Sequence, residues 1–138
     1  GYIGPTPLIL STSLKENLLY GNTAVVDESK ILETCEMFKL FDVVNKEILD
    51  RQVTNTSLSS GQMQKVGFIR AILSNVEILL LDESTSNLDR NTKSLILDII
   101  TNKNITVINS THDPTSFKQI DRHIQIDIVD NKRLIYDI

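Results

Sequence analysis

Two adjacent carboxylates follow an aliphatic run near the middle of the chain. Residues 78–81 (Ile-Leu-Leu-Leu) predict a parallel strand covered on both faces, and Asp82 and Glu83 stand where it ends. Ligands of α/β proteins bind at the carboxyl ends of such strands, where an Asp can help hold Mg²⁺ and a second carboxylate can polarise water. A bare acidic pair can also mark where a strand meets solvent. The residues behind it, Ser84 to Ser86, favour the chemical interpretation.

A helix start rich in serine and glycine precedes this strand. Ser59, Ser60, Gly61 and Gln62 open an amphipathic run to Leu73, which predicts a helix capped by one of the two serines. Free backbone N–H groups and the helix dipole favour a phosphate here, and a glycine lets the anion approach closely. An ordinary N-cap with a glycine in the turn fits the same residues.

A histidine follows the next predicted strand, residues 105–108. His112 is suited to a hydrogen bond with a phosphate or with bound water, although a histidine satisfied at a loop edge fits equally well. Asp113 and Pro114 predict the start of a short helix directly behind it. His123 has no acidic or cysteine partner nearby that would indicate a metal site.

The elements that must position these groups alternate between helix and strand. A helix from Asp89 to about Ile100 separates the two predicted strands, and strands at 123–129 and 133–136 close the chain. This order predicts an α/β fold with a largely parallel core. The first half is predicted to be mostly helical, with no strong strand signal after Leu10. Its expected elements are helices at 13–19, from Asp27 or Ser29 to Phe38, and at 41–48, and a polar loop at 51–57.

Composition limits the class of protein. The chain has 138 residues, 41% hydrophobic and 23% charged, which is typical of one soluble domain or part of a larger one. A net charge of -4 and the absence of a Lys/Arg cluster argue against nucleic acid as a partner. The single Cys35 is expected to be a core residue. Without a bilayer-spanning run or a signal peptide, a cytoplasmic location is expected, and the start at Gly1 suggests a cut through a larger protein.

One phosphate-binding motif is absent from the sequence. A P-loop requires Gly-x-x-x-x-Gly-Lys-Ser/Thr, and none of the five glycines directly precedes a lysine. The chain therefore lacks a lysine-bearing loop of its own for the β- and γ-phosphates.

The combination of these patterns resembles the ATP-binding domain of ABC transporters over essentially the whole chain. Residues 58–62 (Leu-Ser-Ser-Gly-Gln) look like the family's LSGGQ signature, with Ser60 in place of the first glycine. Residues 78–82 resemble the Walker B strand. Residues 86–89 (Ser-Asn-Leu-Asp) are similar to the D-loop, and residues 110–113 (Ser-Thr-His-Asp) look like the switch-histidine loop.

This resemblance implies a role for each motif. Glu83 falls on the position of the catalytic glutamate, Asp82 on that of a Mg²⁺ ligand, and His112 on that of the γ-phosphate contact. Asp89 falls on the D-loop aspartate. The signature residues are expected to bind the ATP of a second subunit in trans, and they are Ser59, Ser60, Gly61 and Gln62.

The resemblance also implies an architecture. The chain is expected to be a partial P-loop NTPase-like ABC ATPase fold that lacks the Walker A region, and the isolated fragment is therefore expected to be inactive. Residues 1–57 match the end of the Q-loop and the helical subdomain, and residues 58–138 match the signature helix and the C-terminal part of the core. The segment from Pro7 to Gly21 is similar to exporter-type members. The family resemblance implies ATP and Mg²⁺ as cofactors, and a second ATPase subunit and a transmembrane domain as partners. It also implies the cytoplasmic side of the cell membrane as the location.

Two departures leave alternatives open. Pro5 stands where the family carries the Q-loop glutamine, and the loop at 51–57 lacks the Gly-Glu pattern that exporters often place before the signature. A degenerate, non-hydrolysing ABC module is therefore one alternative. A soluble ABC-type ATPase in DNA maintenance or translation is another, and transmembrane helices in the parent sequence would distinguish an exporter from it.

Overall fold

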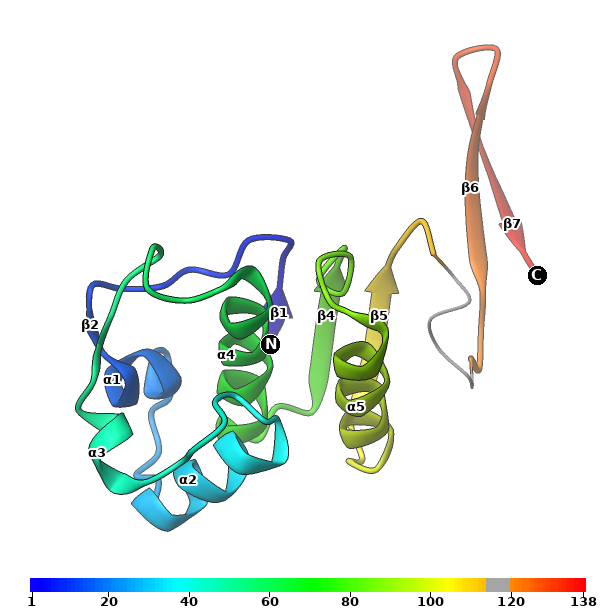
Figure 1. Cartoon of the computed structure of the whole chain (residues 1–138). Coiled ribbons are helices and arrows are strands. Elements are labelled where there is room, and N and C mark those ends of the chain that lie inside the picture. The colour runs from blue at the N-terminus through cyan, green and yellow to red at the C-terminus, as the bar shows by residue number, and fades with distance from the viewer. Residues whose placement is uncertain (114–119) are drawn as a thin grey trace.

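A three-stranded parallel sheet forms the centre of the computed structural model, which describes residues 1–113 and 120–138. The strands are β1 (Tyr2–Ile3), β4 (Ile78–Asp82) and β5 (Thr106–Ser110), in the order β1-β4-β5. The aliphatic run of β4 occupies the middle of the sheet, as its composition predicts (Figure 1). The predicted α/β class with a parallel core is therefore confirmed.

Two helices cover one face of this sheet. Helices α4 (Ser60–Leu73) and α5 (Arg90–Thr101) lie on the same side of it in Figure 1. Leu79 and Leu81 point to that side, and both are buried in the main hydrophobic core. The alternating burial of β4 follows from the pleat, which turns successive side chains to opposite faces.

The prediction that β4 is covered on both faces was wrong. Ile78 and Leu80 remain 53% and 42% exposed. Leu80 pairs with Tyr2 on one side and Ile108 on the other, so these three exposed side chains form an apolar row across the sheet. No element in the described part of the chain packs on this row. An unbroken aliphatic run shows that a strand can be covered twice, but it does not show which element supplies the second cover.

Three short helices precede α4, and they are α1 (Leu14–Leu19), α2 (Glu28–Met37) and α3 (Lys46–Leu49). Two of them, α1 and α2, pack beside α4, and α3 packs beside α1 (Figure 1). The predicted capping box of α1 is present, because Ser13 accepts from the backbone of Glu16 and the Glu16 carboxylate accepts from the backbone of Ser13. Asp27, one of the two predicted caps, begins α2 by accepting from the backbone of Ser29.

The sequence missed a short antiparallel pair. Strand β2 (Thr12–Ser13) pairs with β3 (Gln52–Val53). Strand β3 lies inside the segment 51–57, which was predicted to be a polar loop. The helix predicted over 41–48 is also shorter, because only α3 is helical in that region. Strands of two residues are too short to show a hydrophobic period, and this pair is defined only by contacts between distant segments.

The chain ends in a hairpin formed by β6 (Ile124–Val129) and β7 (Lys132–Asp137), close to the predicted strands. Its turn residues Asp130 and Asn131 have φ of 49° and 59°, the positive values that a tight hairpin turn requires. Figure 1 shows the hairpin apart from the β1-β4-β5 sheet. The short helix predicted after Asp113 falls on residues 114–119, which lie outside the described residues.

Cys35 is a core residue, as predicted. Its side chain is fully buried in α2, and burial raises the pKa of the thiol to about 12. The thiolate form that reacts with oxidants and metals is therefore strongly disfavoured at neutral pH.

Candidate functional site

The start of α4 is held by a capping box. Ser59 is the N-cap, and its hydroxyl oxygen accepts from the backbone N–H of Gln62 at 3.2 Å. The side-chain oxygen of Gln62 accepts in return from the backbone N–H of Ser59 at 2.9 Å. Of the two serines that the sequence proposed as caps, the structure therefore selects Ser59 and places Ser60 inside the helix.

Two donors at this helix start are left for a ligand. The N–H of Met63 already donates to the carbonyl of Ser59, whereas those of Ser60 and Gly61 meet no acceptor in the described part of the chain. A Cβ built on Gly61 would find only a methyl carbon of Leu88, at 4.0 Å. The turn is thus open to an anion, and it lies beside Leu88 of the predicted D-loop.

The two carboxylates lie at the carboxyl end of β4, beside the end of β5. Asp82 closes β4, pairs in register with Ser110 at the end of β5, and accepts a hydrogen bond from the hydroxyl of Tyr2 at 3.3 Å. Both Asp82 and Glu83 are only partly buried. This is the edge at which ligands bind to parallel sheets, and it is where the sequence placed the acidic pair.

Glu83 leaves the strand in a strained conformation. Its φ of 48° lies in the left-handed region, which a residue with a side chain seldom adopts. The carbonyl of Glu83 accepts from the hydroxyl of Ser86 at 2.8 Å, and its N–H donates to Ser110 at 3.0 Å. These bonds over-determine the turn, and strain of this kind is concentrated at functional sites.

His112 meets Glu83 directly. The backbone N–H of His112 donates to one carboxylate oxygen of Glu83 at 2.9 Å, and the ring Nδ1 lies 2.8 Å from the other. When Nδ1 is the donor in this pair, the second ring nitrogen, Nε2, takes no part in the contact with Glu83. The His112 side chain is 79% exposed. The structure therefore brings together the two residues that the sequence singled out as the catalytic pair.

A lysine that the sequence analysis did not single out holds the histidine loop. Lys93 of α5 forms an ion pair with Asp113 at 2.8 Å, directly after His112. Its side chain is 19% exposed, so solvent screens the pair less than an ion pair in open solvent. Nothing in the spacing distinguishes Lys93 from an ordinary charged residue on a helix, because its partner lies on a different element.

Asp89 caps α5. Its carboxylate accepts from the N–H groups of Asn91 and Thr92, at 3.0 Å each, and the hydrogen bonds with Thr92 hold the pKa of Asp89 below its ordinary value. The cap fixes the end of the 86–89 turn beside Gly61. Between the acidic pair and this turn, Ser84 is 1% exposed, and its hydroxyl has no protein partner in the described residues.

The donor set is compatible with Mg²⁺ bound together with a nucleotide. In the described part of the chain, no three His, Cys, Asp or Glu side chains converge as a metal cage, so the strand end offers a metal the carboxylates of Asp82 and Glu83 at most. Mg²⁺ in nucleotide sites takes one or two carboxylates and completes its shell with phosphate oxygens and water. A carboxylate at the strand end, such as Asp82, therefore fits one protein ligand of a metal bound in this way.

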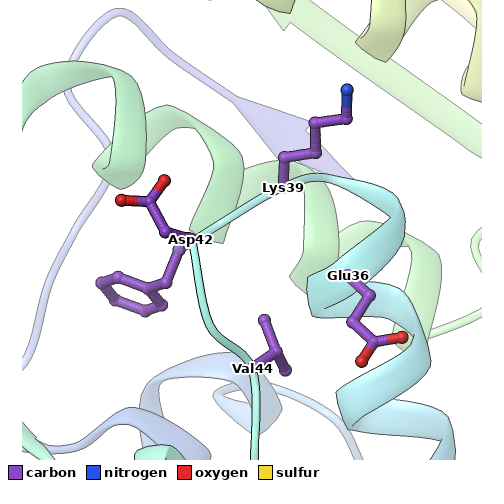
Figure 2. Close-up of a pocket in the computed structure, with 5 residues that line it drawn as sticks. Glu36, Lys39, Asp42 and Val44 are labelled. Atoms are coloured by element: carbon purple, nitrogen blue, oxygen red, sulfur yellow. The ribbon is translucent and has the colours of Figure 1, made fainter.

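One pocket lies away from the candidate site. It has a volume of about 390 Å³ and lies where the chain leaves α2 (Figure 2). It is lined by Glu36, Lys39, Phe41, Asp42 and Val44, and none of the candidate site residues lines it.

Comparison with known proteins shows the family of the chain. A family model described as ABC transporter matches residues 5–86. The sublancin-168-processing and transport ATP-binding protein of Bacillus subtilis is 33% identical over 124 residues, which cover 85% of this chain and 17% of that protein.

Two eukaryotic relatives show similar identity. The mating factor M secretion protein of Schizosaccharomyces pombe is 34% identical over 94% of this chain and 10% of its own length. The ATP-dependent permease of Candida albicans is 33% identical over 90% and 19%, respectively. The chain therefore spans less than a quarter of the curated relatives that it matches.

The fold and the family match together define part of an α/β nucleotide-binding domain of the P-loop NTPase type. The chain belongs to the ABC transporter family. ATP, generally with Mg²⁺, is the nucleotide that this family binds. None of the helices in the described residues has the length and apolar character needed to cross a membrane.

Proposed function

We propose that this chain is part of the ATP-hydrolysing domain of an ABC exporter, which couples ATP hydrolysis to the movement of a substrate across a membrane. The observation that carries the proposal is the contact of Glu83 with His112 at the carboxyl end of β4. A carboxylate held in this way is suited to polarise a water molecule for attack on a phosphate.

Each site residue has a place in this proposal. Asp82 helps to hold Mg²⁺, which supplies charge neutralisation for the phosphates when the nucleotide is bound. Glu83 accepts the proton of the attacking water. The ring of His112 contacts the γ-phosphate, donating from Nε2–H when both ring nitrogens carry a proton. The backbone N–H groups of Ser60 and Gly61, with the hydroxyl of Ser59, receive the phosphate of a second subunit's ATP.

The proposal divides the chain into two parts and implies two partners. Residues 1–57 form the end of the Q-loop and the helical subdomain, and residues 58–138 form the signature helix and the C-terminal part of the core. We propose a second ABC ATPase subunit facing the start of α4 and a transmembrane domain in the same transporter, with the ATPase domain on the cytoplasmic side. The names of two relatives, a secretion protein and a permease, support transport over DNA maintenance or translation.

A non-hydrolysing ABC module is a second candidate. Pro5 stands in place of the Q-loop glutamine, and Ser60 replaces a signature glycine. Proline offers no side-chain oxygen for Mg²⁺ or its water, so a site with normal binding and no turnover is the expected behaviour of such a module. ATP turnover by the intact protein separates the two candidates.

Calorimetry with Mg-ATP tests whether tight nucleotide binding requires a P-loop that this chain does not contain. The intact protein is expected to bind with micromolar or tighter affinity, and the 138-residue chain alone with far weaker affinity, because no residue of this chain forms a P-loop. Micromolar binding by the 138-residue chain would show that the phosphates are held by residues other than those proposed. Absence of binding by the intact protein would remove the proposed function itself.

A further inference from the structure

One loop of the chain is fastened to α4 by side chains instead of by backbone pairing. Residues 4–10 follow β1 and precede α1 without regular secondary structure. The carbonyl groups of Gly4, Pro5 and Leu8 in this loop accept hydrogen bonds from side chains of α4. A segment without backbone partners is normally mobile, so these side chains determine where the loop lies.

Gln64 holds the first part of the loop. Its side-chain N–H₂ group donates to the carbonyl of Pro5 at 2.7 Å and reaches the carbonyl of Gly4 at 3.5 Å. The side chain is only 1% exposed, and its oxygen has no partner among the described residues. A buried amide whose donor is directed to the loop while its acceptor stays unsatisfied is costly for stability alone.

Arg70 holds the second part. Its guanidinium group donates to the carbonyls of Leu8, at 2.6 Å, and of Asn17, and to the side-chain oxygen of Asn17 at 3.1 Å. The fully buried Asn17 side chain in turn accepts from the N–H of Leu10 at 2.8 Å and donates to its carbonyl at 2.9 Å. One arginine therefore fixes the loop both directly and through the asparagine.

Gly67 permits the close approach. It lies midway between Gln64 and Arg70, three residues from each, so all three positions share one side of α4. A Cβ on Gly67 would stand 3.3 Å from a methyl group of Ile3 and 3.7 Å from the Pro7 ring. The helix thus presents a donor, a gap and a second donor to the loop, in that order.

We propose that Gln64 and Arg70 are positioning residues that lock the 4–10 loop to α4, so that the loop and the phosphate-facing start of the helix move as one unit. Displacement of the loop then displaces the turn at Ser59 to Gln62 with it. The functional part of this inference rests on the proposed function, because it takes that turn to be a phosphate site.

Hydrogen exchange of the intact protein, read by mass spectrometry, tests the lock without any nucleotide. In a Gln64→Met, Arg70→Met double variant, the N–H of Leu10 is expected to exchange about tenfold faster, because its partner Asn17 loses its anchor. Peptides from α5 are expected to keep their wild-type rates. The matched control is Lys65→Met, which removes a bond of the same kind from α4 to the carbonyl of Lys39 and should leave Leu10 unchanged.

Equally faster hydrogen exchange in the loop and in α5 would show that the two side chains serve only overall stability. Unchanged exchange at Leu10 would show that they do not hold the loop.

A second comparison adds Mg-ATP. Wild type should gain protection at residues 59–63 and 6–12 together, whereas the double variant should gain it only at 59–63. Joint protection in the double variant would overturn the proposal. Absence of protection at 59–63 in the wild type would refute the proposed function, and the nucleotide-free comparison would still decide the lock.

Discussion

Glu83→Gln is expected to abolish ATP turnover by the intact protein while ATP binding stays largely unchanged. The amide keeps the size of the carboxylate and can still accept from the backbone N–H of His112, so the turn should persist. It cannot accept a proton from water, and loss of a positioned general base lowers kcat by about 10²–10⁴-fold. Steady-state kinetics and nucleotide titration of the same preparation measure both quantities.

The matched control lies at the other end of the same strand. Glu77→Gln makes the same chemical change at an exposed carboxylate directly before β4. This control should leave kcat unchanged, because that end of the sheet carries none of the proposed site residues. Undiminished hydrolysis in Glu83→Gln would count against the assignment of Glu83, and a loss of ATP binding would indicate a structural role.

Gly61→Ala is expected to separate folding from activity. The added Cβ meets nothing closer than Leu88 at 4.0 Å, and alanine is the better helix former by about 1 kcal/mol, so thermal stability should stay the same or rise. The methyl group nevertheless covers the N–H groups that the phosphate must approach. A hydrogen bond to a charged group is worth about 1.5–3 kcal/mol, so turnover should fall about tenfold or more.

Gly67→Ala provides the comparison for this variant. It is the same substitution in the same helix, but its Cβ would stand 3.3 Å from Ile3, and the added methyl group should lower thermal stability. Gly61→Ala should therefore lose turnover without losing thermal stability, whereas Gly67→Ala should lose thermal stability. Melting curves and ATPase rates of both variants measure these effects. Full turnover in Gly61→Ala would show that the start of α4 is not in contact with phosphate.

Local signals were sufficient to predict much of the fold. The capping box at Ser13, the cap at Ser59 (one of the two serines proposed) and the cap at Asp89 each depend on residues within three positions, and all three are present. The short pair β2–β3 depends on residues about forty positions apart and left no local pattern. The exposed face of β4 was missed for the same reason, because exposure depends on which other segments are present to cover it.

For the candidate site, the sequence predicted which residues belong to it but not the contacts that hold them. Motif order placed Glu83 and His112 in the sequence, but only the register of β4 against β5 explains why they meet. The ion pair of Lys93 and the loop contacts of Arg70 could not be inferred, since each joins a helix to a distant loop. Side chains that act through tertiary contacts have no spacing rule to reveal them.

The central claim is that this chain contributes to two different ATP sites. In the proposed arrangement, the start of α4 serves the nucleotide of a partner subunit, and Asp82 and Glu83 serve the nucleotide of their own subunit. A dimer that pairs a Glu83→Gln subunit with a Gly61→Ala subunit distinguishes this arrangement from one in which both motifs serve the same nucleotide. In the proposed arrangement, both defects fall in one site and the other site is wild type.

ATPase activity of this mixed dimer, purified through different tags on the two subunits, is the most direct measurement. The account predicts that the mixed dimer regains a large share of wild-type turnover, although dimers of either variant alone are nearly inactive. A mixed dimer as inactive as its two parents would contradict the account, because each subunit would then spoil its own site.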